Sequence, residues 1–438
     1  MKTSKILIIL SLLYGGAGAA GAAEDLDITR SVRLALDNNL YMKLAKASGE
    51  TRKAEALMAA SRLLPQVDLA ISQTRTLKEN LTAMGFGYGP DGNPSLIGPF
   101  NTFDARLRLV QTLLDLPAWN TSLSKDSEKR SAKLRVDLAA EQVAAAAALA
   151  YLEVLRSSAA VSSAASGLEV AASLRSLAEN KHDAGTATGL DVLRARTREA
   201  EESLRVSRAQ TALQEAFLRL KHLLGLPFSK DIRLAETLEF TGYEAPPSEG
   251  AVSSALAGRL ELQMARADLS AATYALKAAR TARIPSLAVS GGAAMSGNNP
   301  NREAKLVGDM GIALRVPLLA GGRVDAAIDA AAAGRDRAES LLEDAAAQVE
   351  EETLTALYRL KASAEEVSTA SMTVTMASQE LDMARNRFSA GVGDNVELVN
   401  AQTSLSRAKD SLIDALSRNK EANIRLTLAL GRMKNFKF

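Results

Sequence analysis

The chain has 438 residues, of which 47% are hydrophobic and only 4% aromatic, and its 53 basic residues nearly balance its 51 acidic ones. A thick globular core usually needs more aromatic side chains than this, whereas a chain rich in alanine can form long helices that pack closely. The balanced charge argues against a nucleic-acid-binding protein, and the absence of cysteine excludes disulfides, thiolate metal sites and a lipid-modified N-terminal cysteine.

The first residues are typical of a secretory signal. Lys2 and Lys5 precede an apolar run, and small residues then reach Ala20-Gly21-Ala22, an expected cleavage site. We therefore expect a signal over residues 1–22. Beyond it the sequence has no uninterrupted apolar run of eighteen residues, so any entry into a membrane is expected to use strands.

The next part of the chain reads as a helix, two strands and a helical hairpin. Residues 25–64 have helical apolar spacing, which a proline ends. Apolar and polar residues then alternate over 66–80 and 101–115, which predicts two strands with one face of each kind. Residues 117–183 contain one glycine and, after the first residue, no proline, which predicts a helix on the order of 100 Å long. A small-residue turn and a return helix over 189–225 follow.

The same order occurs a second time. After a linker over 226–250, residues 251–438 predict a helix, strands over 286–294 and 306–316, a long helix, a tip over 390–395 and a return helix. Residues 181–225 align without gaps with residues 387–431, and Gly185 falls on Gly391 and Gly225 on Gly431. Glycines that match at both ends of an ungapped segment indicate duplication of the exported chain.

The alternation in the strands predicts a sheet with a lipid face and a wet face. Four strands are too few to close a barrel, since small barrels need about eight or more. Several copies of the chain must therefore complete it. An ordinary sheet sandwich packed on helices is the alternative. In the barrel, polar residues would line the lumen, and we predict these positions to be Asp68, Asp104, Arg106, Arg108 and Arg315.

Three segments show a family resemblance. They are the Val-Pro-Leu-Leu-Ala-Gly-Gly-Arg turn over 316–323 and the two tips over 184–195 and 390–401. With the duplication, they resemble the TolC family of outer-membrane efflux channels. The resemblance implies a mainly α fold with a membrane β-barrel, in which duplicated, antiparallel coiled-coil helices form a tunnel. Each protomer would contribute four strands to a trimeric, twelve-stranded barrel.

The resemblance also implies the function and the partners. Such homotrimers lie in the outer membrane and its lipid, extend into the periplasm, and dock on a periplasmic adaptor (membrane fusion) protein and an inner-membrane pump. They serve as exit ducts in tripartite efflux or type I secretion, for drugs, small molecules or proteins. No enzyme activity, cofactor, metal or nucleic-acid partner is implied. An exported structural coiled-coil protein of the envelope, without channel activity, is the alternative function.

Family members often carry a ring of acidic residues at the periplasmic gate. The matching positions are Glu397 and Asn400, with Asp394 in the tip itself, while an arginine that braces the closed tip in some members matches Gly393. Three converging carboxylates would attract cations. The alternative is that Glu397 is a solvated carboxylate near a helix start, where the helix dipole favours a negative charge in any case.

The remaining tip residues are candidates for adaptor docking, a role that rests on the resemblance. Local turn chemistry explains several of them equally well, because glycine tolerates positive φ and threonine caps helices. The predicted docking positions are Gly185, Thr186, Thr188, Asp191, Gly391 and Gly393.

Two other readings find little support in the sequence. The stripe Met372, Met376 and Met383 could bind a soft metal, but such stripes are usually core, and the two histidines lie in no ligand cluster. Motifs of hydrolases, phosphate-binding loops and zinc proteases are absent.

Overall fold

The computed structural model describes residues 24–436 except residues 86, 89, 95, 241, 243–245 and 302. The predicted signal over 1–22 lies outside the described residues. The chain divides into two compact units. The sheet unit comprises Tyr41–Ala139 and Glu249–Thr353, and the tip unit comprises the remaining described residues. Each unit draws on both repeats of the sequence.

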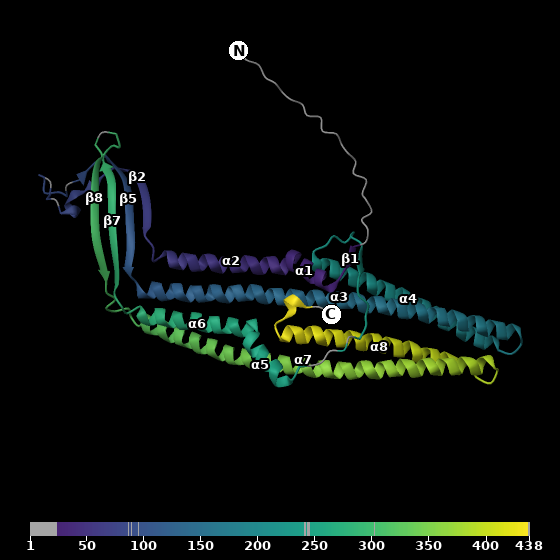
Figure 1. Ribbon diagram of the computed structural model, residues 1–438. Coiled ribbons are helices and arrows are strands. Elements are labelled where there is room, and N and C mark those ends of the chain that lie inside the picture. The colour runs from purple at the N-terminus through teal and green to yellow at the C-terminus, as the bar shows by residue number, and fades with distance from the viewer. Residues whose placement is uncertain are drawn as a thin grey trace, which may run out of the picture. The chain divides into compact units, whose positions relative to one another are not determined.

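The sheet unit contains four antiparallel strands in the order β2, β5, β7, β8 (Figure 1). The outer strands β2 and β8 each have one edge without a strand partner among the described residues. Nearly every residue of both is exposed. Such open edges offer unpaired N–H and C=O groups to another strand. The strands are β2 (Gln66–Thr76), β5 (Phe100–Leu114), β7 (Ser286–Gly297) and β8 (Lys305–Arg315).

The strand register separates the polar and apolar residues. Asp68 lies opposite Arg108, and Arg315 lies opposite Ser286. Because cross-strand partners share a face, the register places all five predicted lumen residues on one face of the sheet. The other face carries the apolar positions Val67, Leu69, Ile71, Phe103, Leu107, Leu109, Ile312 and Leu314.

Helices continue from the strands in the sheet unit. α3 packs on α6 through small polar residues: Ser124 Oγ donates to Ala271 O at 2.8 Å, and the Ser127 and Ser270 hydroxyls lie 3.3 Å apart. Side chains this small let the helix backbones approach closely. The helices are α2 (Leu40–Ser61), α5 (Ser248–Gly258), α6 (Leu260–Thr281) and the first parts of α3 (Leu116–Asp183) and α7 (Arg323–Ser389).

The tip unit holds both helical hairpins. The remainder of α3 turns into α4 (Gly189–Leu224), and the remainder of α7 turns into α8 (Asn395–Ala429). Leucine and alanine side chains of α7 and α8 form a core with Leu174 of α3. One stretch of α3 is long and apolar enough to cross a membrane, but most of it is buried, as is usual for a core helix. The unit is completed by β1 (Glu24–Leu26), α1 (Ile28–Asn38), β6 (Ile232–Leu234) and η2 (Met433–Asn435).

The element lengths confirm the duplication. The equivalent helices α1 and α5 both have 11 residues, and α2 and α6 both have 22. The long helices α3 and α7 have 68 and 67 residues, and the return helices α4 and α8 have 36 and 35. The mainly helical, duplicated fold with four long strands is therefore the one that the sequence predicts.

The structure corrects three predicted boundaries. The helix expected over 25–64 is interrupted at Asn39, whose side chain donates to Leu223 O at the end of α4, 3.0 Å away. The strand expected over 66–80 ends at Thr76. A short pair, β3 (Glu79–Asn80) and β4 (Leu96–Ile97), and the turn η1 (Leu81–Met84) lie between β2 and β5 in the chain. β7 reaches Gly297 rather than residue 294, because its glycine-containing end is paired with β5.

Candidate gate and docking tips

The first tip reverses the chain between α3 and α4. Gly185 has φ +74°, and its amide donates to His182 O at 2.8 Å, while Thr186 N donates to Lys181 O at 2.8 Å. These bonds satisfy carbonyls at the end of α3. Thr188 then caps α4: its hydroxyl accepts from Asp191 N at 3.3 Å, and its own N donates to the Asp191 carboxylate at 2.9 Å. The reciprocal bonds form a capping box.

The capping box also explains the electrostatics of Asp191. The hydrogen bond from the Thr188 hydroxyl, 2.7 Å from Asp191 Oδ2, is the main cause that holds the pKa of Asp191 below its ordinary value; partial burial opposes the shift. The side chain of this predicted docking residue is therefore bound to its own tip.

The second tip has the same turn but a different cap. Gly391 has φ +78°, and Val392 N donates to Arg387 O at 3.1 Å. A β-carbon at Gly393 would lie 2.9 Å from Phe388 N, so the closeness of the backbone selects glycine here. Asp394 caps α8 by accepting from Val396 N at 3.1 Å. This predicted gate residue therefore serves the helix start.

The side-chain amide of Asn395, which the sequence analysis missed, joins the two tips. Asn395 is 2% exposed, and its Nδ2 donates to Asp191 O at 2.9 Å. The bond links the first turn of α8 to the first turn of α4. Nothing in the local pattern around Asn395 marks it, since an asparagine at a helix start usually indicates a cap.

Glu397 lies in an ion pair within its own hairpin. Arg387 Nε, in the last turn of α7, lies 3.2 Å from Glu397 Oε1, and the two side chains are 56% and 47% exposed. Asn400, about one turn further along α8, is exposed. The two acidic gate residues thus differ: Asp394 caps α8, whereas the carboxylate of Glu397 pairs with Arg387. The Arg387–Glu397 pair carries no net charge.

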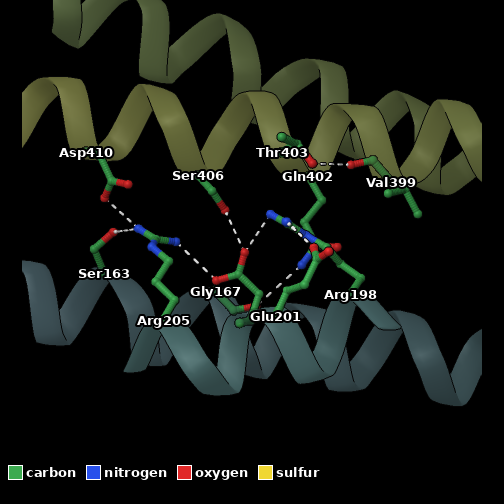
Figure 2. Close-up of polar contacts among 11 residues, drawn as sticks. Ser163, Gly167, Arg198, Glu201, Arg205, Val399, Gln402, Thr403, Ser406 and Asp410 are labelled. Carbon is green, nitrogen blue, oxygen red and sulfur yellow. Dashed lines mark hydrogen bonds and ion pairs between the residues drawn. The ribbon is translucent and has the colours of Figure 1, made fainter. Parts of the chain in front are cut away.

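A buried charge cluster ties α4 to α8. Glu202 of α4 is 1% exposed and lies 2.6 Å from Arg198 Nη2 and 3.1 Å from Arg205 Nη1. Arg205 extends from α4 toward Asp410 of α8 (Figure 2), with Nη2 2.5 Å from Asp410 Oδ1. Ser406 of α8 donates to Glu202 at 3.4 Å. Two cations and a hydroxyl thus compensate the buried carboxylate.

Gly167 of α3 makes room for this cluster. A β-carbon at residue 167 would lie 2.8 Å from Glu202 Oε2. The carbonyl of Gly167 accepts a hydrogen bond from Gln402 Nε2 of α8 at 3.5 Å (Figure 2). The single glycine inside the long helix is therefore a contact position for two neighbouring helices.

On the polar face of the sheet, two charges that the sequence analysis missed join the predicted set. Arg106 lies 3.2 Å from Asp104 on its own strand and 3.2 Å from Asp309 on β8. The second contact passes over β7 at Gly292, where a β-carbon would lie 3.1 Å from Asp309 Oδ1. By the register, Lys305 shares this face. The alternation over 305–315 could have identified both residues.

The methionine stripe is not core in the described chain. Met372, Met376 and Met383, for which core packing was expected, are 57–62% exposed on α7. Among the described residues, no group of three or more histidine, aspartate or glutamate side chains has the arrangement of a metal site.

The comparison with known families decides the identity. The model of the family described as outer membrane efflux protein matches residues 32–226 and 251–432. The chain belongs to the outer membrane efflux protein family. Over 432 residues it is 25% identical to the pyoverdine export outer membrane protein OpmQ of Pseudomonas aeruginosa, a match that covers 94% of this chain and 86% of OpmQ. The family resemblance drawn from the tips is thereby confirmed.

Solved structures share the fold. The outer membrane protein VceC of Vibrio cholerae matches with a TM-score of 0.81 at 20% identity, over 92% of this chain and 96% of VceC. The CmeC outer membrane channel of Campylobacter jejuni matches with a TM-score of 0.82 at 18% identity, over 98% of this chain and 94% of CmeC. The protein is thus an outer-membrane efflux channel, and its family and fold are those of exit ducts rather than enzymes.

Proposed function

We propose that three copies of the chain form a passive exit duct that is gated at its periplasmic tips. Three four-stranded sheets would close into a twelve-stranded barrel, and the helical hairpins would form the tunnel. The duct would serve a tripartite efflux or type I secretion system. The export role of the relative OpmQ supports this direction of transport.

The open sheet carries this proposal. Both β2 and β8 have a free edge among the described residues, and one face of the sheet is apolar while the other is charged. In lipid every backbone polar group needs a partner, so strands of this kind are stable there only when the edges meet in a closed barrel. The apolar face would then meet lipid, and the face with Asp68, Arg106 and Arg315 would line the lumen.

The tips would dock on a periplasmic adaptor protein that connects the duct to an inner-membrane pump. Leu190 and Leu193 beside the first tip are 54% and 62% exposed, and Val392 in the second tip is 70% exposed. Apolar side chains exposed beside rigid turns suit contact with another protein. Gly185, Thr186, Thr188, Asp191, Gly391 and Gly393 would shape these turns rather than supply most of the contact area.

Purification from the outer membrane tests the duct. We expect a trimer that dissociates on heating in detergent, shows β signal by circular dichroism and forms ion-conducting pores in planar bilayers. A water-soluble monomer without β signal would contradict the proposal. A trimer without conductance would favour the structural coiled-coil alternative.

A further inference from the structure

A groove runs between α2 and α3 in the sheet unit and has a volume of about 750 Å³. Along α2 it extends from Lys46 to Ala60, which is about 21 Å at the rise of a helix. Its floor consists of small or apolar side chains such as Ala56 and Val136, and Leu57 at its edge is 64% exposed. The groove therefore offers an apolar seat that nothing in the described chain fills.

The groove carries a surplus of positive charge. Five basic and three acidic side chains line it, which gives a net charge of +2. The basic residues come from both helices, so cations stand on both sides of the apolar floor. They are Lys46, Lys53, Lys129, Arg130 and Lys133.

Three of these cations have acidic partners on their own helix. Lys53 Nζ lies 3.0 Å from Glu50 on α2. On α3, Asp126 serves two cations, since it lies 2.5 Å from Lys129 Nζ and 3.5 Å from Arg130 Nε. These pairs account for two of the three acids in the groove.

The other two cations are lysines without an ion pair among the described residues. Lys46 of α2 and Lys133 of α3 are both exposed. A second groove between the same two helices shows no such surplus. It is lined by two basic and two acidic side chains, and its Arg135 lies 3.2 Å from Asp268 of α6. The surplus charge is therefore specific to the first groove.

A tryptophan indicates which way the basic groove faces. Trp119, Asp126 and Lys133 are seven residues apart, so they lie on one face of α3. Trp119 is 57% exposed and lies in the first turn after β5. Exposed tryptophan at the end of a membrane strand is typical of the lipid headgroup layer. In the proposed duct the groove would therefore lie on the outer wall.

Distance separates the two lysines from the membrane. Lys133 lies 14 residues beyond Trp119, which is about 21 Å along α3. A β-carbon at Gly49 would lie 3.1 Å from Val136, so Lys46 of the antiparallel α2 is further from the sheet than Lys133 is. The headgroup layer on one side of a bilayer is only about 5–8 Å thick. Both lysines would thus be in the periplasm, beyond the reach of membrane lipid.

We propose that this groove binds an acidic, amphipathic helix of a periplasmic partner protein. About 14 helical residues span the groove at 1.5 Å per residue. Apolar side chains on one face of the helix would pack on Ala56, Val136 and Leu57, as in other complexes where a helix occupies a groove. Carboxylates on its two flanks would pair with Lys46 and Lys133. The location of the groove on the outer wall rests on the proposed duct.

Binding of a designed peptide tests the groove. The probe is a fluorescent, helix-stabilised peptide of 15 residues, with leucines at spacings of three and four and glutamates on both flanks. We expect saturable binding to the natural chain in nanodiscs of zwitterionic lipid, which weakens as salt is added. A scrambled peptide of the same composition should bind at least tenfold more weakly. Equal binding of the two peptides would show charge attraction alone and overturn the proposal.

Lysine variants identify the binding surface. Lys46→Glu and Lys133→Glu should each weaken peptide binding by about three- to fivefold, because each replaces an attraction by a repulsion. Lys133→Arg should bind as the natural chain does. Lys78→Glu is the control, since it makes the same charge change in the loop after β2, at the other end of that strand from α2. Equal losses in Lys78→Glu and Lys133→Glu would contradict the assignment.

Two further measurements identify the natural occupant. Phosphatidylglycerol added to the nanodiscs should not displace the peptide, and displacement would assign the groove to lipid instead. A photo-crosslinking amino acid in place of Leu57 should, in growing cells, capture a segment of a periplasmic protein that mass spectrometry identifies as an acidic amphipathic helix. Crosslinks to lipid or to this chain alone would overturn the proposal.

The groove and the duct can fail separately, because one copy of the chain contains the whole groove. A conducting trimer that does not bind the peptide would refute the groove and leave the duct intact. A monomer that binds the peptide but does not conduct would refute the duct and leave the helix-binding groove intact.

Discussion

Equivalent acids in the two tips have different partners. Asp191 and Glu397 both lie three residues after a helix cap, at Thr188 and Asp394 respectively. The Asp191 carboxylate returns to its own cap and closes a capping box. The longer side chain of Glu397 instead reaches Arg387 on the preceding helix. One repeat therefore uses this position for helix stability, while the other leaves a charge pair at the candidate gate.

The capping box predicts a pH dependence of the first tip. Because the folded state holds the pKa of Asp191 below its ordinary value, its stabilising contribution is present above about pH 4 and is lost as pH falls through the lowered pKa. Amide hydrogen exchange over residues 186–192, corrected for intrinsic rates, should lose protection as pH falls through this window. Asp191→Asn should remove the pH-dependent part, while Asp183→Asn should keep it. Equal pH profiles for Asp191→Asn and the natural chain would contradict this assignment.

Among the elements, the contact between α4 and α8 depends on a buried carboxylate. Glu202 is surrounded by Arg198, Arg205 and Ser406, and Asp410 compensates the outer guanidinium. The two hairpins arose by duplication, but the second repeat has no equivalent of Glu202, because the matching position is Ala408. The cluster is therefore a contact between the two return helices, α4 and α8, to which the two repeats contribute different residues.

Removing the charge of Glu202 should weaken this contact strongly. Glu202→Gln leaves two guanidinium groups without their buried counter-ion, which costs roughly 3 kcal/mol of unfolding free energy. Glu201→Gln is the matched control: its side chain is 59% exposed, and its pair with Arg198 should contribute less than about 1 kcal/mol. Thermal unfolding of both variants measures the difference, and equal midpoints would show that the cluster carries no special stability.

At the scale of the whole molecule, the order of the helices and strands could be predicted from the sequence, but the contacts between them could not. Proline and glycine punctuation and the change of period are local signals, so the duplicated helices, the strands and both tips could be placed from them. The partners of Asn395, Glu397 and Glu202 lie on other helices, and no local pattern encodes such distances. The break at Asn39 was missed for the same reason, because the contact that favours it is with the end of α4.

A gate built from three copies would combine three Arg387–Glu397 pairs. Because each pair is neutral, we expect the natural channel to have only weak cation preference. Arg387→Gln should expose three carboxylates and raise the cation-to-anion permeability ratio several-fold, and Glu397→Gln should lower it. Reversal potentials in a salt gradient measure both.

Arg385→Gln is the control for the gate, since Arg385 is exposed two residues away on another side of α7. It should leave the ratio unchanged. If Glu397→Gln changes neither the permeability ratio nor the block by divalent cations, Glu397 is a solvated helix-start residue.

The small side chains of β7 would affect the width of the proposed pore. On the polar face of the sheet, this part of β7 presents only Gly292 and Ala294, so its backbone is almost bare there, and the bridge from Arg106 to Asp309 spans it. In a barrel of three copies, three such bare strips would make the width of the pore depend locally on the main chain and on the paired charges of Arg106 and Asp309. A bulky residue grafted at Gly292 would then act as a constriction, and it would also break the bridge that keeps the long guanidinium arm against the wall.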